Sequence, residues 1–252
     1  MLNKASSLML LAAFALPACY WQNDDPTDYL AQLLNANNPY MTTRTSVVGD
    51  NASSIEALLV DNTMFPARET LYCVFYDVSL PRVLDGLFYA HLRGVDVRVG
   101  LDEDNLDGIG YRSLKEFIHT STSAPGGRKL WLGNSGAGQV YLNTCIADSQ
   151  RVWVATAAPT VQDLYSKSAF GMYFQTDIYG LSTKFATELD LITHGAFGSA
   201  KQRLNRRNHW LVGNVDVGVY MAPSDNPFEG FTTARTGQAE ESIYIYTTEW
   251  LS

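Results

Sequence analysis

The feature that most constrains the fold is a strand, a helix and a second strand that follow one another between residues 69 and 101. Residues 69–76 are a run of β-forming residues that predicts a buried strand. Ser79 is placed to cap a helix with Pro81 in its first turn, and Gly94 is placed to end that helix. Alternating aliphatic residues then predict a strand over 95–101. Two strands joined by one helix predict a parallel pair with a right-handed crossover.

The rest of the chain continues this alternation of helices and strands. Apolar residues at helical spacing predict helices near residues 55–59 and 114–118 and over 178–192. Runs of β-forming residues predict strands over 129–132, 139–147, 152–156 and 170–175. The predicted fold class is therefore α/β, with a mixed β-sheet flanked by helices on both faces.

The N-terminus carries the pattern of an export signal. Lys4 precedes an apolar run over residues 5–16, which is too short to span a bilayer, and small residues lead to Cys19. The placement of Cys19 resembles the cleavage box of bacterial lipoproteins, in which this cysteine becomes the lipidated N-terminus. We expect residues 1–18 to be a signal peptide, Cys19 to carry acyl chains that bind membrane lipid, and residues 19–50 to be a tether. The alternatives are an ordinary cleaved signal with a free Cys19, or a short buried helix.

These N-terminal features predict where the protein is found. We expect it to be exported to the bacterial cell envelope and anchored there by lipid, or otherwise to be periplasmic or secreted. Acyl chains bind membranes through their buried methylene groups, so the acidity of the chain does not oppose this anchoring.

A short internal similarity suggests a repeated unit. Glu69 opens a strand with the residues Glu-Thr-Leu-Tyr, and Glu241 opens a second one with Glu-Ser-Ile-Tyr. We expect residues 51–200 to form a first repeat, 201–214 a linker and 215–252 the beginning of an incomplete second repeat. Chance similarity between two β-strands is the alternative.

The same residues resemble a known family. Residues 69–78, then the run from Ala90 to Val99 and Asp102, resemble the opening of the phospholipase D superfamily. Residues 133–148 and the strand after them lie where that family carries its H-x-K-x4-D motif and a following G-S-x-N strand. The resemblance covers residues 50–252. It implies a phosphodiesterase fold in which two such motifs face each other, with one histidine as the nucleophile and the other as the general acid.

The motif itself is eroded in this chain. Tyr141 takes the position of the histidine and Asn143 that of the lysine, and of the motif only Asp148 matches. Alternation along a strand places Tyr141, Asn143 and Cys145 on one face. Tyrosine is protonated at neutral pH and is a poor nucleophile towards phosphorus, and asparagine brings no cation. In the next strand the Gly, Ser and Asn of the family are replaced by Ala155, Thr156 and Ala158.

Three hypotheses follow from this erosion. The first is a membrane-anchored, catalytically silent phospholipase D-like domain that binds a partner or ligand, such as a phospholipid or another phosphodiester, or that supports an active subunit. The second is a working phosphodiesterase whose intact motif lies on another chain, such as an intact homologue, or was lost by truncation. Pairing with a second copy of this chain as a homodimer is a separate expectation from the family's assembly. The third is a shortened gene product without a function of its own.

Other candidate sites are weaker. The acidic run from Asp102 to Asp107 superficially resembles a calcium loop, but Leu114 stands where the bidentate Glu should be, so we interpret the run as a solvated turn. Gly133, Gly136 and Gly138 precede no helix and are interpreted as a flexible strand entry. His91 lies near a helix end without a partner at metal-ligand spacing. We therefore expect neither a metal ion nor a cofactor.

Charge and cysteine content complete the prediction. The chain has 18 basic and 26 acidic residues, a net charge of −8 that argues against broad nucleic-acid binding. The chain has one basic cluster, which consists of Lys201, Arg203, Arg206 and Arg207. It is either a solvated linker between repeats or a contact for lipid headgroups or other anions. Cys73 and Cys145 both fall on predicted core strands, where either a disulfide or two buried thiols fit.

Overall fold

The computed structural model describes residues 41–47, 52–118, 129–133, 140, 142–165, 169–176, 180–193, 196, 209–212 and 215–221. Among them, the elements in chain order are β1 (Met41–Val47), α2 (Ala52–Leu59), a π-helix η1 (Val60–Met64), β2 (Thr70–Phe75), α3 (Pro81–Leu92), β3 (Asp96–Asp102), a 3₁₀ turn η2 (Glu103–Asn105), α4 (Ile109–Ile118), β4 (Leu130–Gly133), β5 (Thr144–Ala147), β6 (Arg151–Ala155), α5 (Val161–Leu164), β7 (Phe170–Thr176), α6 (Leu181–Ile192), β8 (His209–Val212) and β9 (Val215–Gly218).

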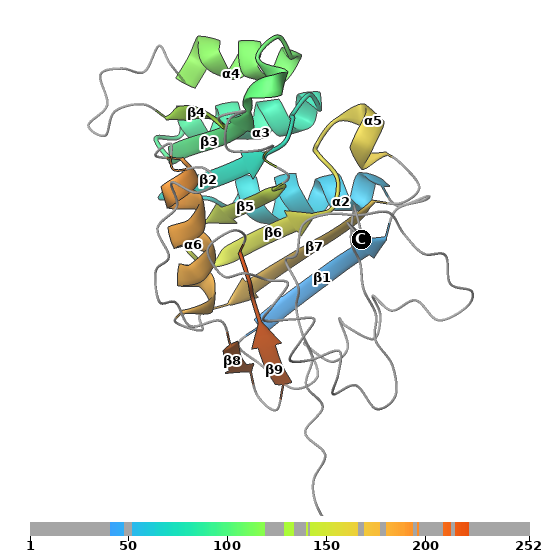
Figure 1. The fold of residues 1–252 in the computed structure, drawn as a ribbon, viewed down its shortest axis with the longest axis vertical. Helices are drawn as coiled ribbons and strands as arrows, with labels where there is room; N and C mark the ends of the chain where they lie inside the picture. Colours follow the sequence, from blue (N-terminus) through green and yellow to red (C-terminus); the bar gives the residue numbers. More distant parts are fainter. Residues whose placement is uncertain are drawn as a thin grey trace, which may run out of the picture.

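The main sheet has seven strands in the order β1-β7-β6-β5-β2-β3-β4. Strands β2, β3 and β4 are parallel to one another, and β2, β5, β6, β7 and β1 pair antiparallel in turn. The sheet is therefore mixed, with a parallel half and an antiparallel half that meet where β2 pairs with β5 (Figure 1). The predicted crossover through α3 is confirmed, since β2 and β3 pair in parallel.

Helices cover both faces of the sheet, as predicted. On one face, α2, η1, α3 and α4 enclose a core that includes Leu71, Phe75, Val99 and Trp153. On the other face, α6 packs on a second core that includes Val74, Ile146 and Phe174 (Figure 1). Because both faces are covered, β2 is apolar along almost its whole length instead of alternating with polar residues.

The ends of α3 confirm two sequence signals and correct a third. Pro81 is the first helical residue, where its missing N–H costs nothing, and Gly94 ends the helix with a φ of 84°. Ser79, predicted as the cap, is not the cap. Leu80 takes that place without a side-chain bond, and the backbone N–H of Ser79 donates to the carbonyl of Pro159 instead.

Two predicted segments differ from the structure. The strand expected over 139–147 is regular only from Thr144, because the side chain of Asn143 takes the backbone N–H of Tyr76 and the β2–β5 ladder ends there. The tether expected over 19–50 contains β1, which pairs along its whole length with β7. The last part of that range is therefore an edge strand of the sheet.

A small hairpin lies around the predicted boundary between linker and second repeat. Strand β8 falls inside the range 201–214, expected to be a linker, and pairs antiparallel with β9 in a separate two-stranded sheet. Val219 and Met221 then pack in the second core. The division into two repeats remains a prediction. In the part of the chain that the structure describes, every helix is too short or too polar to cross a membrane.

Candidate functional site

The residues that resemble the family motif lie on either side of β5, which pairs with β2 on one side and β6 on the other. Asn143 directly precedes this strand and Asp148 directly follows it. Cys145, between them, pairs in register with Cys73 of β2. Leu142 and Ile146 belong to the second core and Cys145 to the first, so the predicted alternation of side chains along this strand is confirmed for these residues.

Asn143, at the lysine position of the motif, is used to hold the end of β2. Its side chain is buried and its Oδ1 accepts the backbone N–H of Tyr76 at 3.1 Å. The Tyr76 carbonyl in turn accepts a hydrogen bond of 2.7 Å from Nδ2 of Asn105. The Asn143 carbonyl accepts the N–H of Ala155 at 2.9 Å. The residue therefore joins three segments of backbone and contributes a neutral amide where the family has a cation.

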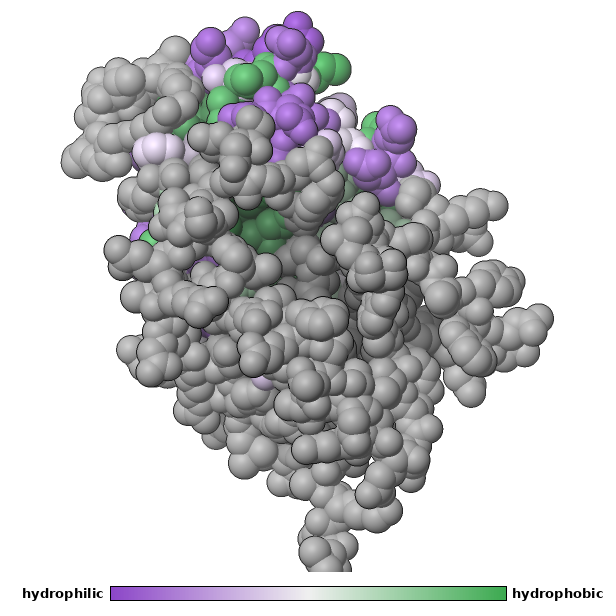
Figure 2. Space-filling view, viewed as in Figure 1, coloured by the Kyte–Doolittle hydropathy of each residue, from purple (hydrophilic) through white to green (hydrophobic). Residues whose placement is uncertain are grey.

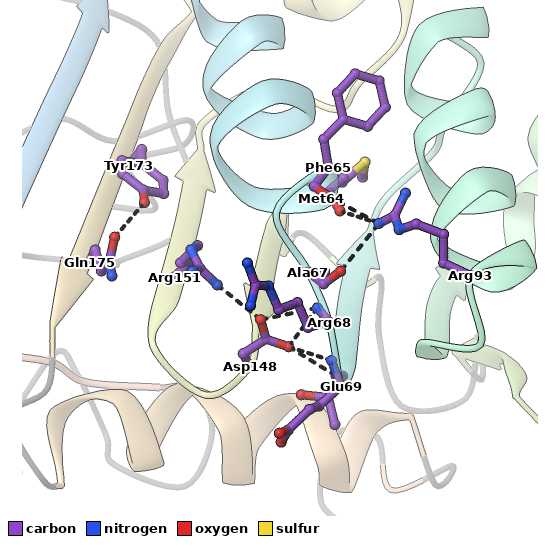
Figure 3. A network of polar contacts seen from close by, with 11 residues as sticks. Met64, Phe65, Ala67, Arg68, Glu69, Arg93, Asp148, Arg151, Tyr173 and Gln175 are labelled. Carbon is purple, nitrogen blue, oxygen red and sulfur yellow. Dashed lines mark hydrogen bonds and ion pairs between the residues drawn. The ribbon is translucent and has the colours of Figure 1, made fainter.

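Asp148, the residue that matches the motif, is used at the opposite end of β5. Its carboxylate accepts backbone N–H groups of Arg68, Glu69 and Thr70 at 2.8–3.1 Å, and Nη1 of Arg151 donates to it at 2.9 Å (Figure 3). Its φ of 51° lies in the left-handed region, which aspartate tolerates better than most residues in a tight turn. Asp148 therefore has the geometry of a turn residue.

The environment of Asp148 favours its charged form. Burial alone would raise the pKa of this carboxyl group, but the N–H groups of Glu69, Thr70 and Arg68, together with the guanidinium of Arg151, hold the pKa below its ordinary value. The carboxylate is thus ionised at neutral pH, and the backbone donors and Arg151 take up its oxygens. Little of its acceptor capacity remains for a substrate or for a catalytic partner.

A disulfide joins β2 and β5 between these two ends. Cys73 and Cys145 are bonded, their Cα atoms are 4.1 Å apart, and both residues are fully buried. Of the two alternatives that the sequence left open, the structure has the disulfide. Asn143, the Cys73–Cys145 disulfide and Asp148, which we call the β2–β5 clasp, connect the parallel half of the sheet to the antiparallel half.

The strand after the motif lacks the asparagine amide expected from the resemblance, and Thr156 keeps a hydroxyl group at the serine position. Ala155 and Ala158 are buried and Thr156 is half-buried. The following Pro159 carbonyl accepts the N–H groups of Ser79 and Leu80, each at 3.1 Å. This loop therefore lies against the start of α3, and the two alanines provide no side-chain donor for a phosphoryl oxygen.

Carboxylates gather at the same edge of the sheet, which the sequence reasoning missed. Asp77 follows the carboxyl end of β2, and the buried Asp102 ends the parallel strand β3 and accepts the N–H groups of Val140 and Asp104. Burial, together with the nearby charge of Asp163, raises the pKa of Asp77 despite a hydrogen bond from the N–H of Val78. The sequence signal that could have located these carboxylates is their position directly after two neighbouring strands, because the carboxyl ends of parallel strands lie at one edge of a sheet.

The acidic run after β3 is divided by the structure. Asp104 and Asp107 are exposed, as expected for a solvated turn, whereas the expectation is wrong for Asp102, which is buried and bonded to backbone. Gly133, expected at a flexible strand entry, is the last residue of β4 and pairs with Asp102. Among the described residues, no group of three or more acidic, histidine or cysteine side chains is arranged to hold a metal ion.

His91 lies away from the motif positions. It is near the C-terminal end of α3, and its ring centroid is 6.1 Å from that of Phe117 of α4. Burial, with the nearby charge of Lys129, lowers its pKa. Because α3 runs back from the carboxyl end of β2 to the beginning of β3, His91 and Lys129 lie at the opposite edge of the sheet from Asn143.

Several predicted site residues lie outside the described residues. They are Cys19, Tyr141, Gly136, Gly138, Lys201, Arg203, Arg206 and Arg207. The signal peptide expected over 1–18 lies outside them as well.

Comparison with known proteins gives similarity at the level of structure. No protein family model and no curated protein matches the chain. Among solved structures, it is similar to Nuc, a phospholipase D family member from Salmonella typhimurium, with 14% identity over 60% of this chain and 92% of that one and a TM-score of 0.49. NucT from Helicobacter pylori is 14% identical over 63% and 99%, with a TM-score of 0.45. Polyphosphate kinase from Porphyromonas gingivalis is 14% identical over 69% and 30%, with a TM-score of 0.44.

Proposed function

We propose that this chain is a membrane-anchored phospholipase D-like domain that does not hydrolyse phosphodiesters and acts as a binding or supporting domain. The observation that carries the proposal is the use of the motif residues in the β2–β5 clasp. Asn143 and Asp148 are bonded to backbone groups of β2 and the loops next to it. These bonds serve the connection between the two halves of the sheet, and they give both motif residues a structural role.

The charges at this edge support the same proposal. A phosphodiester is an anion, and its transition state gains stability from cations and hydrogen-bond donors. Asp77, Asp102 and Asp163 place carboxylates there instead. Since like charges repel, this arrangement disfavours the binding of a phosphate group as well as its reaction. A domain of this kind is suited to a structural or partner-binding role.

The disulfide supports export. Disulfides form and persist in oxidising compartments and are rare in the bacterial cytosol. A buried bond between β2 and β5 therefore fits a chain that folds after crossing the inner membrane. The proposed anchor is Cys19 with its acyl chains. Metabolic labelling with a fatty acid should mark the wild-type protein, and Cys19→Ser should abolish the label, whereas equal labelling of both would exclude this anchor.

Hydrolysis assays test the proposed silence. Purified protein should release no product from phosphatidylcholine or from bis-(p-nitrophenyl) phosphate above a preparation from cells without the gene. Turnover that co-purifies with the protein would refute the proposal if Tyr141→Phe or Asn143→Ala removes it. Tyr111→Phe on α4 is the matched control, because it deletes the same hydroxyl group from a residue that packs on the first core away from the motif.

A further inference from the structure

The outer surface at the C-terminal end of α3 is unusually apolar. Phe88, Tyr89 and Leu92 of α3 and Phe65 at the end of η1 are exposed by 37%, 53%, 62% and 45%. Figure 2 shows hydrophobic residues among hydrophilic ones at the end of the molecule that carries α4. We call these four residues the α3 surface. Exposed apolar groups that cluster in this way mark sites of interaction with proteins or membranes, whereas single exposed residues do not.

Contacts connect the elements that carry this surface. The ring centroid of Phe88 is 6.0 Å from that of Tyr89 and 5.2 Å from that of Phe117 of α4. Nη2 of Arg93 donates to the carbonyls of Met64, Phe65 and Ala67 at 3.2 Å each, which fixes the end of η1 beside α3. Figure 3 shows the ring of Phe65 directed away from these carbonyl contacts. The aromatic side chains are thus held in place by ordered backbone.

The charges around the molecule give this surface an orientation. Arg68 and Arg93 are exposed at the edge where β2 and β3 begin, with Glu69 beside them. Around the carboxyl ends of these strands the charged residues are mostly acidic: Asp77, Asp102, Glu103, Asp104 and Asp107. The seven residues of β3 separate the two edges by about 20 Å. A body that contacts the α3 surface therefore meets Arg68 and Arg93 together with the exposed Glu69 and Asp85, and lies away from the acids at the carboxyl ends of the strands.

We propose that the α3 surface docks on a phospholipid bilayer, with Tyr89, Leu92 and the neighbouring aromatic rings in the headgroup region and with Arg68 and Arg93 next to lipid phosphates. Aromatic side chains flanked by Arg and Lys are typical of membrane interfaces, where an apolar body and a polar tip are both satisfied. Docking in this orientation turns the acidic edge away from anionic lipid. The chain between Cys19 and β1 is long enough for an acylated N-terminus to reach the same bilayer.

Vesicle binding tests this inference separately from the acyl anchor. It rests on the membrane attachment in the proposed function, so the protein used is the chain from residue 19 onward with Cys19→Ser, which carries no acyl group. Sedimentation is measured with vesicles of phosphatidylcholine alone and with phosphatidylcholine and phosphatidylglycerol in equal parts. We expect binding to both and tighter binding to the mixture, with Arg68→Gln removing most of the difference.

A matched pair of variants decides the site. Tyr89→Ser with Leu92→Ser should weaken vesicle binding by at least about tenfold, because two apolar groups no longer enter the interface. Ile109→Ser with Val161→Ser is the control, since these residues are exposed by 61% and 63% but lie near the acidic edge, and binding should change by less than about twofold.

Three results would overturn the inference. The first is an acyl-free protein that does not bind either kind of vesicle. The second is equal binding by the Tyr89/Leu92 and Ile109/Val161 variants. The third is a dimer of the wild-type protein in the absence of lipid that is lost in the Tyr89/Leu92 variant, as measured by sedimentation equilibrium. The α3 surface would then join two copies of the chain. If the wild-type protein takes up no fatty-acid label, the Cys19 anchor is refuted, but vesicle binding by the acyl-free protein is unaffected.

Discussion

The two ends of β5 are held to β2 by different chemistry. At one end, the Asp148 carboxylate accepts three backbone N–H groups and a guanidinium, and at the other the Asn143 amide accepts a single N–H. The first end is ionic and has several bonds that share one acceptor group. The second is neutral and depends on one bond from a buried side chain. The disulfide between Cys73 and Cys145 lies between them.

This difference teaches how a motif residue should be interpreted. The resemblance to the phospholipase D superfamily predicts Asp148 as the motif aspartate, yet its geometry is that of a turn residue that holds backbone. Its presence is therefore explained without catalysis. Asn143 departs from the motif at the position where a cation would serve the phosphate. Agreement with a motif at Asp148 is therefore no evidence of activity, and the proposal of a silent domain depends more on Asn143.

The largest effect is expected when the disulfide is removed, because it joins β5 to β2 covalently between the two hydrogen-bonded ends. Cys73→Ala with Cys145→Ala should lower the free energy of unfolding by about 4 kcal/mol, since the bond closes a loop with a sequence separation of 72. Urea denaturation of the oxidised wild type and the variant measures this. A loss below about 1 kcal/mol would mean that the hydrogen bonds at the two ends suffice to join the halves of the sheet.

The next largest effect is expected at the ionic end. Asp148→Ala leaves the N–H groups of Arg68, Glu69 and Thr70 without their acceptor and should cost about 2–3 kcal/mol in the free energy of unfolding. Asp107→Ala is the control, because this carboxylate is exposed and its loss should change stability by less than about 0.5 kcal/mol. Equal effects of the two substitutions would show that the Asp148 contacts contribute nothing to stability.

The fold could be predicted from the sequence because its signals are local. The apolar run of β2, the Pro81 and Gly94 boundaries of α3 and the alternating valines of β3 each specify one element, and short connections then specify the crossover. The hydrogen bond from Tyr76 to Asn143 joins residues far apart in the chain. The sequence around Asn143 therefore gave no indication that β5 begins only at Thr144. Strand β1 was missed because its run of Thr, Arg and Ser resembles a linker in composition.

The contacts of the candidate site residues could not be predicted from the sequence. The resemblance placed Asn143 and Asp148 at motif positions, but the partners of both lie on β2 and the loops next to it. The sequence left the state of Cys73 and Cys145 open, because only the β2–β5 register brings the two cysteines opposite each other. The parallel pairing of β2 and β3, which the sequence predicts, brings Asp77 and Asp102 to one edge, but the burial of Asp102 and its hydrogen bonds from Val140 and Asp104 left no local signal.

A pH titration sharpens the contrast between the ionic and the neutral end. The folded chain lowers the pKa of Asp148 below its ordinary value of 3.8, so the unfolded chain binds its proton more readily. The stabilisation is complete above the unfolded pKa and is lost as the pH falls through the folded one. We expect Asp148→Asn to cost about 1–2 kcal/mol at neutral pH and progressively less in acid. Asp96, whose pKa is also lowered, is present in both proteins and cancels in the difference.

Urea denaturation of wild type and Asp148→Asn at a series of pH values checks this expectation. The measured quantity is the difference in the free energy of unfolding between the two proteins. A difference that stays constant from neutral pH down to about pH 2 would mean that the charge of Asp148 contributes nothing to the ionic end.

The smallest effect is expected at the neutral end, where Asn143→Ala removes one acceptor. The loss should be about 1 kcal/mol, the net value of a typical hydrogen bond, and it should be independent of pH between neutral and acid because no charge is involved. Combining it with Asn105→Ala tests whether the two asparagines act together, since both bind the backbone of Tyr76. If the double variant loses clearly less than the sum of the single ones, the two side chains hold one backbone segment jointly. Strict additivity would instead make Asn143 an independent contact, and the neutral end of the β2–β5 clasp would then consist of that single bond.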